Sequence, residues 1–159
     1  VNNIQEVDPK LHARFNAELR TYRYFIHSKK DPFKKSFSWM ISQSLDTSKM
    51  QEAANLLIGN KDFEAFSKKH TDVKNHMCTV SKASLSFFEN EIVFEISANR
   101  FLRNMVRAIV GTLVEVGLNK LSLEDFKKII ASKDRQKAAA SAPANGLYLW
   151  DVVYPITPS

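Results

Sequence analysis

Four segments of the chain carry apolar residues in the patterns that are typical of β-strands. They are residues 19–27, 79–88, 91–98 and 147–154, and only Glu89 and Asn90 separate the second from the third. In residues 91–98 the apolar side chains occupy every second position, at Ile92, Phe94, Ile96 and Ala98. Because successive side chains of a strand point to opposite faces, this is the pattern of a half-buried strand. We therefore expect an early strand, a central β-hairpin and a final strand.

Two other segments repeat their apolar residues at intervals of three and four, as an amphipathic helix does. The first runs to Leu57, and Gly59 would end it in a left-handed conformation. Its first residue would follow one of three candidate capping residues, Asp46, Thr47 and Ser48. The second covers residues 122–132, where Ser122 stands three positions before Asp125 in a weak form of the capping box.

Residues 99–117, NRFLRNMVRAIVGTLVEVG, form the longest apolar pattern and also contain arginines. We expect a helix that is capped by Asn99 and stopped by Gly117. At 100° per residue, one narrow sector opposite the centre of the apolar stripe holds Arg100, Arg103 and Arg107. For Arg100 and Arg103 we favour a simple interpretation, in which the stems lie along the protein and the charged ends reach water.

Arg107 differs from the other two because it lies in the middle of this helix, near the edge of the apolar stripe. Ala108 and Gly111 beside it leave room for close packing. A buried guanidinium without a partner costs several kcal/mol. A charge at this position therefore needs a partner, and a carboxylate in a cleft would be the natural one.

The elements follow one another as β, α, β, β, α, α, β, which contains the split βαβ plan of ferredoxin-like folds with one added helix. The sequence therefore predicts a single α+β domain. Its sheet would be mostly antiparallel, with the helices on one face.

Composition narrows the chemistry. The 159 residues carry a net charge of +6, and the pI is near 9.4. This charge is only a weak indication of a polyanionic partner, because a soluble basic protein without such a partner would have it too. With four glycines the chain has neither a P-loop nor a dinucleotide-binding motif, so ATP and NAD are not expected. The four histidines lack metal-ligand spacing, and no metal is expected.

One cysteine, Cys78, excludes an internal disulfide and suggests a reducing, cytoplasmic setting. It lies within a predicted strand and is interpreted as a small core residue. No run of apolar residues reaches the length of a membrane-spanning helix, so no membrane partner is expected.

The segment HARFNAELRTYRYF interleaves arginines with aromatic residues. Guanidinium groups bind phosphates and aromatic faces stack on unpaired bases, so the segment suits an RNA surface. Alternation in the strand would place Arg20, Tyr22 and Tyr24 on one face and Arg23 on the other. An ordinary strand with core tyrosines and solvated arginines explains the same residues.

Taken together, four stretches resemble the tRNA pseudouridine synthase A family. They are LHARFNAELRTYRYFI, NKDFEAFSK, ANRFLRNMVRAIVGTLVEVG and KDRQKAAASAPANGLYLWDVVYP, in the order the family has them. The resemblance implies two ferredoxin-like halves joined through a continuous sheet, with a basic RNA-binding cleft between them, in an enzyme that is usually a homodimer. The present chain, residues 1–159, resembles the C-terminal half only.

The resemblance also implies that the catalytic aspartate belongs to a GRTD-type motif in the N-terminal half. No RTD occurs in this sequence, which begins at Val1, and none of its aspartates is assigned as the nucleophile. The reaction implied is the conversion of uridine to pseudouridine in the tRNA anticodon stem-loop, without a cofactor. We expect the N-terminal half to be a necessary partner and the chain alone to be inactive.

By the same resemblance, three residues match positions with roles in the family's active site. Arg107 matches the arginine that pairs with the catalytic aspartate. Tyr22 matches the tyrosine that contacts the target uracil and can take its C5 proton. Leu147 matches the apolar residue that packs on the flipped base. With the aspartate in the N-terminal half, we expect Arg107 near a surface cleft without a strong carboxylate partner in this chain. Arg14 matches the HARF arginine, which implies a role in RNA binding or in joining the two halves. The expected RNA contacts are Arg14, Arg20, Arg100 and Arg103. The chain departs from the family pattern at Asn145, where many members carry histidine, and at Lys74, where arginine is usual.

Two alternatives stay open. A non-catalytic RNA-binding module of ferredoxin-like shape would explain the charge and the aromatic strand, although no glycine occupies the position that an RNP1 strand requires. A structural dimerisation domain would use the apolar sheet without any need for Arg107.

Overall fold

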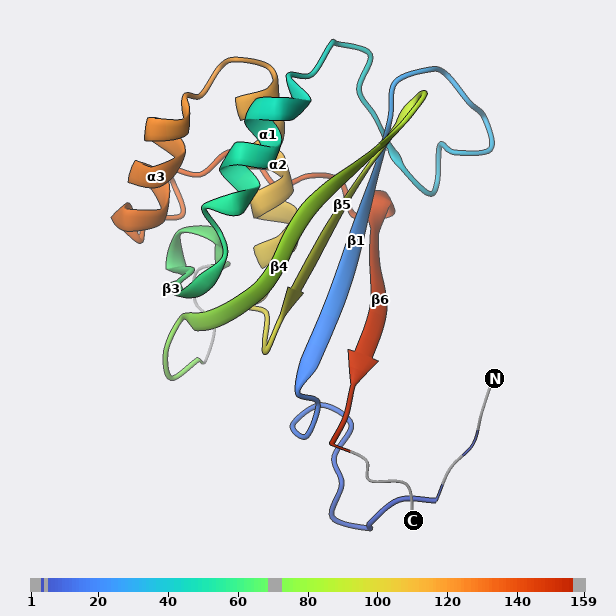
Figure 1. The fold of residues 1–159 in the computed structure, drawn as a ribbon, viewed down its shortest axis with the longest axis vertical. Coiled ribbons are helices and arrows are strands. Elements are labelled where there is room, and N and C mark those ends of the chain that lie inside the picture. The colour runs from blue at the N-terminus through green and yellow to red at the C-terminus, as the bar shows by residue number, and fades with distance from the viewer. Residues whose placement is uncertain (1–3, 5, 69–72, 156–159) are drawn as a thin grey trace.

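The structure is a computed structural model that describes residue 4 and residues 6–68 and 73–155. Within these residues six strands form one sheet, and helices pack against one side of it (Figure 1). The strands are β1 (Leu19–His27), β2 (Trp39–Met40), β3 (Gly59–Asp62), β4 (Met77–Phe88), β5 (Glu91–Ala98) and β6 (Leu147–Val153). The α-helices are α1 (Thr47–Asn55), α2 (Met105–Gly117) and α3 (Leu123–Ser132), and the two 3-10 turns are Glu64–Phe66 and Ala144–Gly146.

The sheet has the order β2-β1-β5-β4-β3, and β6 pairs with the same edge of β1 as β2 does. The pairing is antiparallel everywhere except between β1 and the two-residue β2. Without the short β2 and β3, the order is β6-β1-β5-β4 with α1 and α2 as the connecting helices. This is the split βαβ arrangement, and it confirms the predicted α+β, ferredoxin-like class, with α3 as the added helix.

The core lies between the sheet and the helices. Tyr24 of β1 and Ile96 of β5 are fully buried beneath α2. All residues of α2 are buried except Arg107 and Glu115. A helix that is apolar on nearly every side must be buried on nearly every side. Besides the sheet, α2 is surrounded by α1, α3 and the loop before β6 (Figure 1).

The predicted start of the second helix at Asn99 is wrong. The helix begins at Met105, and Asn104 before it adopts a left-handed conformation with φ of 68°. The Asn104 amide donates a hydrogen bond to Ser141 Oγ over 2.6 Å, which ties the helix start to the loop before β6. The periodicity continues upstream of Met105 because Leu102 is buried without being helical. Arg100 and Arg103 therefore lie in a loop, not on one helix face with Arg107.

The other helix boundaries are close to those expected. Asp46 caps α1, accepting a hydrogen bond from Lys49 N, and Ser122 and Asp125 form the predicted capping box of α3. Gly59 has the expected positive φ, 106°, but it opens β3 and does not end α1, which stops at Asn55.

None of the helices in the described part of the chain is both long and apolar enough to cross a bilayer.

Candidate functional site

A cavity of about 500 Å³ gathers four of the residues that the sequence singled out. It lies between the start of β1, the turn that precedes it and the loop that follows β5. Its walls are made by Arg14, Phe15, Ala17, Arg20, Tyr22, Asn99, Arg100 and Phe101. Arg14, Arg20, Tyr22 and Arg100 were expected to meet RNA or substrate, whereas Arg103, Arg107 and Leu147 lie outside this cavity.

Tyr22 occupies the inner wall of the cavity. It is partly buried on the same face of β1 as Tyr24, and its ring meets Phe101 edge to face with centroids 5.1 Å apart. Within the described residues the Tyr22 hydroxyl makes no hydrogen bond. An aromatic ring held by its neighbour, with a hydroxyl directed to no protein partner, can contact a bound base.

Arg20 uses its guanidinium to hold the protein together. Nη1 donates hydrogen bonds to the carbonyls of Ala17 (2.9 Å) and Asn99 (2.6 Å), and Nη2 donates to the carbonyl of Arg14. These bonds join the 12–17 turn to β1 and to the loop after β5. Arg20 thus positions the backbone at Arg14. The arginine-aromatic pattern of the sequence does not indicate this structural role of Arg20.

Arg14 and Arg100 bring the other charges to the cavity. The Arg14 side chain is exposed, with its guanidinium carbon 5.5 Å from the centre of the Phe15 ring. Arg100 reaches Asn75 Oδ1 over 3.4 Å, a long contact that leaves most of its donors available. Arg103 is exposed further along the same loop, where its carbonyl accepts a hydrogen bond from Lys68 N.

Arg107 lies on α2 and is half-buried against the loop that leads into β6. Its Nε donates a hydrogen bond to the Ala142 carbonyl over 2.7 Å, and the Ala142 N–H donates to the Arg107 carbonyl over 2.9 Å. No carboxylate among the described residues lies within ion-pair distance of its guanidinium. The absence of an acidic partner within the described residues agrees with what the family resemblance implies for Arg107. The expected position beside a cleft is not seen, because Arg107 lines neither the cavity at Tyr22 nor the one at the other end of β1.

The loop before β6 is held tightly over α2 and β1. A Cβ on Gly111 would lie 1.9 Å from the Ala140 carbonyl oxygen, so only glycine allows this approach. Arg135 donates hydrogen bonds to the carbonyls of Ala138 and Ala139 and to Ser141 Oγ. These contacts fix the loop that positions Arg107 and Leu147.

Leu147 opens β6 opposite Tyr24 and packs on the edge of the core while remaining partly exposed. Tyr24 is fully buried and donates its hydroxyl to the Pro143 carbonyl over 2.7 Å. Burial raises the pKa of the Tyr24 hydroxyl and the Arg107 charge opposes that rise, so Tyr24 stays protonated as a donor. Tyr22 and Tyr24 are same-face neighbours on β1, about 7 Å apart along the strand, so the Arg107–Leu147 region adjoins the cavity.

Asn145, the departure from the family pattern, fastens the same loop to a distant segment. Its Nδ2 donates hydrogen bonds to the carbonyls of Lys35 and Ser38, each over 3.0 Å. Its Oδ1 is buried and has no hydrogen-bond partner within the described residues.

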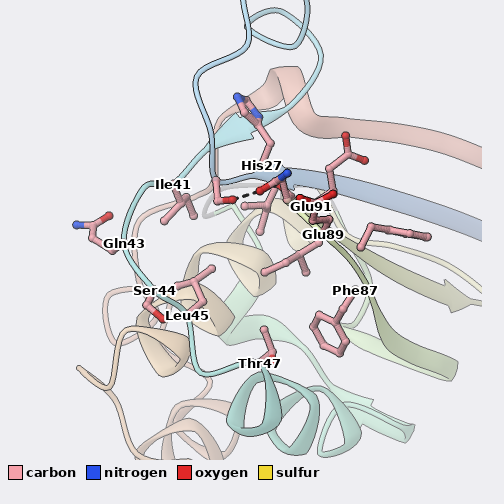
Figure 2. A pocket seen from close by; sticks show the side chains of 14 residues that line it. His27, Ile41, Gln43, Ser44, Leu45, Thr47, Phe87, Glu89 and Glu91 are labelled. Carbon is pink, nitrogen blue, oxygen red and sulfur yellow. Dashed lines mark hydrogen bonds between the residues drawn. The ribbon is translucent and has the colours of Figure 1, made fainter.

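A second cavity, of about 310 Å³, lies at the other end of β1 and contains none of the predicted site residues. Ile41, Leu45 and Thr47 line one side and the hairpin residues Phe87 and Glu89 line the other (Figure 2). Its charged lining residues are carboxylates, so it does not suit a polyanion.

Asp62, Glu64 and His76 could together hold a metal ion, because their ligand atoms lie within 4.8 Å of one another. Lys133 already binds Asp62, with Nζ 2.9 Å from Oδ2. Burial works against the charged Asp62, but the Lys133 hydrogen bond and neighbouring donors outweigh it and lower the pKa of that carboxyl. The group is remote in sequence from the predicted site and is explained as an ion-pair cluster.

Cys78 is buried in β4, where burial raises the pKa of its thiol to about 11. The thiol is therefore protonated and unreactive, in agreement with its interpretation as a core residue.

A sequence profile described as tRNA pseudouridine synthase matches residues 53–155, which is more than half of the chain. The chain belongs to this family. Among curated relatives, the tRNA pseudouridine synthase A of Bacteroides thetaiotaomicron is 49% identical over 158 residues, which is 98% of this chain and 59% of the relative. The enzyme of the same name from Bacteroides fragilis is 51% identical over 98% of this chain and 62% of its own length. That from Geobacillus sp. is 38% identical over 97% of this chain and 63% of its own length.

These three tRNA pseudouridine synthases are thus longer than the chain, which spans about three fifths of their length. The profile match includes Arg107 and Leu147 but not the 12–17 turn or Tyr22. The similarity to the Bacteroides thetaiotaomicron protein extends over these N-terminal residues as well.

Proposed function

We propose that the chain is the C-terminal part of an enzyme that converts uridine to pseudouridine in tRNA. The observation that carries the proposal is the half-buried Arg107 guanidinium, which has no carboxylate partner among the described residues. A segment outside this chain would supply the carboxylate. Family membership and the printed names of the relatives support the reaction and tRNA as the substrate.

In the proposed reaction the bond between N1 of uracil and C1′ of ribose breaks, the base turns in its pocket, and C5 bonds to C1′. The C5 proton then leaves and N1 gains a proton, so the product is an isomer of uridine and no cofactor is needed. Arg107 would hold the absent aspartate ionised and oriented through charge-assisted hydrogen bonds. Leu147 would pack on the flipped uracil, and Tyr22 would contact it and take the C5 proton.

The target base must leave its stack, which costs a few kcal/mol that protein contacts have to offset. The cavity beside Tyr22 offers aromatic surface and the charges of Arg14 and Arg100 for this purpose. Arg103 extends the basic surface along the loop after β5. We propose the anticodon stem-loop as the part of tRNA that binds here.

The proposal has consequences for assembly. The complete enzyme would join an N-terminal half, which carries the catalytic aspartate, to this C-terminal half, and would act as a homodimer in the cytoplasm. The 159-residue chain alone would bind RNA but form no pseudouridine.

The test compares the complete open reading frame with the 159-residue chain on an unmodified tRNA transcript, in buffer that contains EDTA. We expect pseudouridine from the complete protein only, and tRNA binding by both proteins. Because phosphate contacts dominate such binding, it should weaken steeply with salt. Absence of pseudouridine with the complete protein would refute the enzymatic proposal. Retained tRNA binding in that case would favour the alternative, a non-catalytic RNA-binding module.

A further inference from the structure

We propose that Phe15 is a stacking surface for an unpaired base of the bound RNA strand, next to the uridine-binding position at Tyr22. This inference rests on the proposed binding of tRNA. It assigns one specific contact to Phe15, whereas the sequence indicated only that the arginine-aromatic segment containing this residue suits an RNA surface.

The Phe15 ring is exposed, yet it forms part of a cavity wall. Its exposed fraction is 73%, although it lines the cavity together with Tyr22, Arg14 and Arg100. Leaving an aromatic ring in water forgoes the favourable burial of its surface. A ligand that covers the ring would recover that free energy.

The backbone that presents Phe15 is fixed. Phe15 N and Asn16 N donate to the His12 carbonyl over 3.1 and 2.9 Å, and His12 N donates to Asn16 Oδ1 over 2.7 Å. Arg20 clamps the same turn through the carbonyls of Arg14 and Ala17. A pre-ordered aromatic residue loses little conformational entropy when it binds a partner.

The neighbours of Phe15 favour a nucleic acid over an apolar partner. The His12 ring lies at a centroid distance of 4.5 Å, and the Arg14 guanidinium carbon is 5.5 Å from the ring centre. Arg14 and Arg100 can take backbone phosphates while the ring stacks on the base between them. Positive charge combined with exposed aromatic faces is the usual design of surfaces that bind single-stranded nucleic acids.

Phe88 at the end of β4 provides a matched control. Its ring is 63% exposed, which is similar to Phe15, but it lines the cavity that contains Glu89 and Glu91. A polyanion is not expected there. Phe88→Ala removes an exposed aromatic ring without touching the basic surface.

The test measures binding of a short single-stranded RNA by fluorescence anisotropy, with the 159-residue chain and with the complete protein. We expect Phe15→Ala to weaken binding by roughly 5- to 100-fold, Phe15→Trp to restore it, and Phe88→Ala to change it less than about 2-fold. The slope of binding against salt should be unchanged in Phe15→Ala. In Arg14→Met it should fall by about 0.7, the value for one phosphate contact on a single strand.

An abasic scan of the RNA identifies stacking directly. At one position, removal of the base should abolish the difference between wild type and Phe15→Ala. The proposal is overturned if the difference persists at every abasic position, if Phe15→Ala binds like wild type, or if neither wild-type protein binds RNA. It is also overturned if Phe15→Ala only lowers the melting temperature of the complete protein, because the ring would then pack on another part of the polypeptide. Pseudouridine formation by the wild-type complete protein is measured separately, so failure of the stacking proposal leaves the enzymatic one intact.

Discussion

At the scale of single residues, the arginines of this chain differ more than their sequence context indicates. Arg20 donates to three backbone carbonyls and orders a turn, whereas Arg107 donates to the Ala142 carbonyl and has no acidic partner in the described residues. The carbonyl contacts of Arg20 include Asn99, which is 79 positions away. Local sequence patterns hold no information about such a contact, which explains why Arg20 was expected to contact RNA and not to order a turn.

The two glycines of α2 give a prediction at this scale. A Cβ at Gly111 would lie 1.9 Å from a backbone oxygen, but at Gly117 the nearest atom would be the flexible Met50 Sδ, at 2.6 Å. We expect Gly111→Ala to reduce the free energy of unfolding by about 2 to 3 kcal/mol. Gly117→Ala should cost less than about 1 kcal/mol, because Met50 can move and alanine favours the helix. Urea denaturation measures both, and equal losses would contradict this account of the Ala140 contact.

At the scale of elements, periodicity predicted the long strands, the hairpin and the helices, because each of these has a buried face that repeats. It could not predict β2 and β3, because strands of two and four residues are too short to show a repeating pattern. Both are defined by their hydrogen bonds to neighbouring strands. The start of α2 was misplaced because Leu102 is buried from a loop and continues the apolar pattern. Of the candidate site, the arginine-aromatic pattern identified Arg14, Arg20 and Tyr22, but neither Phe101 nor the loop contacts that hold Arg107.

Asn104 gives a prediction at the scale of elements. Its left-handed φ of 68° and its hydrogen bond to Ser141 both set the start of α2. Asn104→Ala should lower the free energy of unfolding by about 1 to 2 kcal/mol, because alanine is strained in this conformation and cannot donate. Asn104→Gly removes only the hydrogen bond and should cost about 1 kcal/mol or less.

The matching measurement is a set of urea unfolding curves that includes Ser141→Ala, alone and combined with each Asn104 variant. The losses should be less than additive when both hydrogen-bonding partners are removed. Full additivity would show that the Asn104–Ser141 contact does not stabilise the helix start.

At the scale of the whole molecule, ion pairs join elements that are distant in sequence. Glu95 of β5 accepts hydrogen bonds from Lys82 of β4 over 2.6 Å and from Arg23 of β1 over 2.5 Å. The Arg23 guanidinium carbon also lies 4.0 Å from the centre of the Trp150 ring on β6. Four adjacent strands are thus connected on the sheet face opposite the helices.

This network predicts an acid-dependent loss of stability. The Lys82 hydrogen bond lowers the pKa of Glu95, burial opposes it, and Arg23 lowers it further. Because the carboxyl binds its proton less readily in the folded state, its contribution is complete above the unfolded pKa of about 4.3 and is lost as the pH falls through the lower folded pKa. The melting temperature should therefore be nearly constant at neutral pH and should decline below about pH 4.

Glu95→Gln removes the titrating group and provides the control. The variant should be less stable than wild type at pH 7, and the difference in melting temperature should shrink as the pH is lowered toward 2 or 3. A difference that stays constant over this range would show that the carboxylate charge does not stabilise the sheet.

The central claim is that Arg107 meets a catalytic carboxylate from outside this chain, and the most direct test is pseudouridine formation by the Arg107→Met variant of the complete protein. Glu115→Met, which replaces the other residue of α2 that is not buried, serves as the control. We predict at least a 100-fold loss of pseudouridine formation for Arg107→Met, about the effect of removing one charge-stabilising group from an active site. Its affinity for tRNA should change less than about 3-fold, and Glu115→Met should retain full activity. Wild-type turnover by a folded Arg107→Met enzyme would contradict the account.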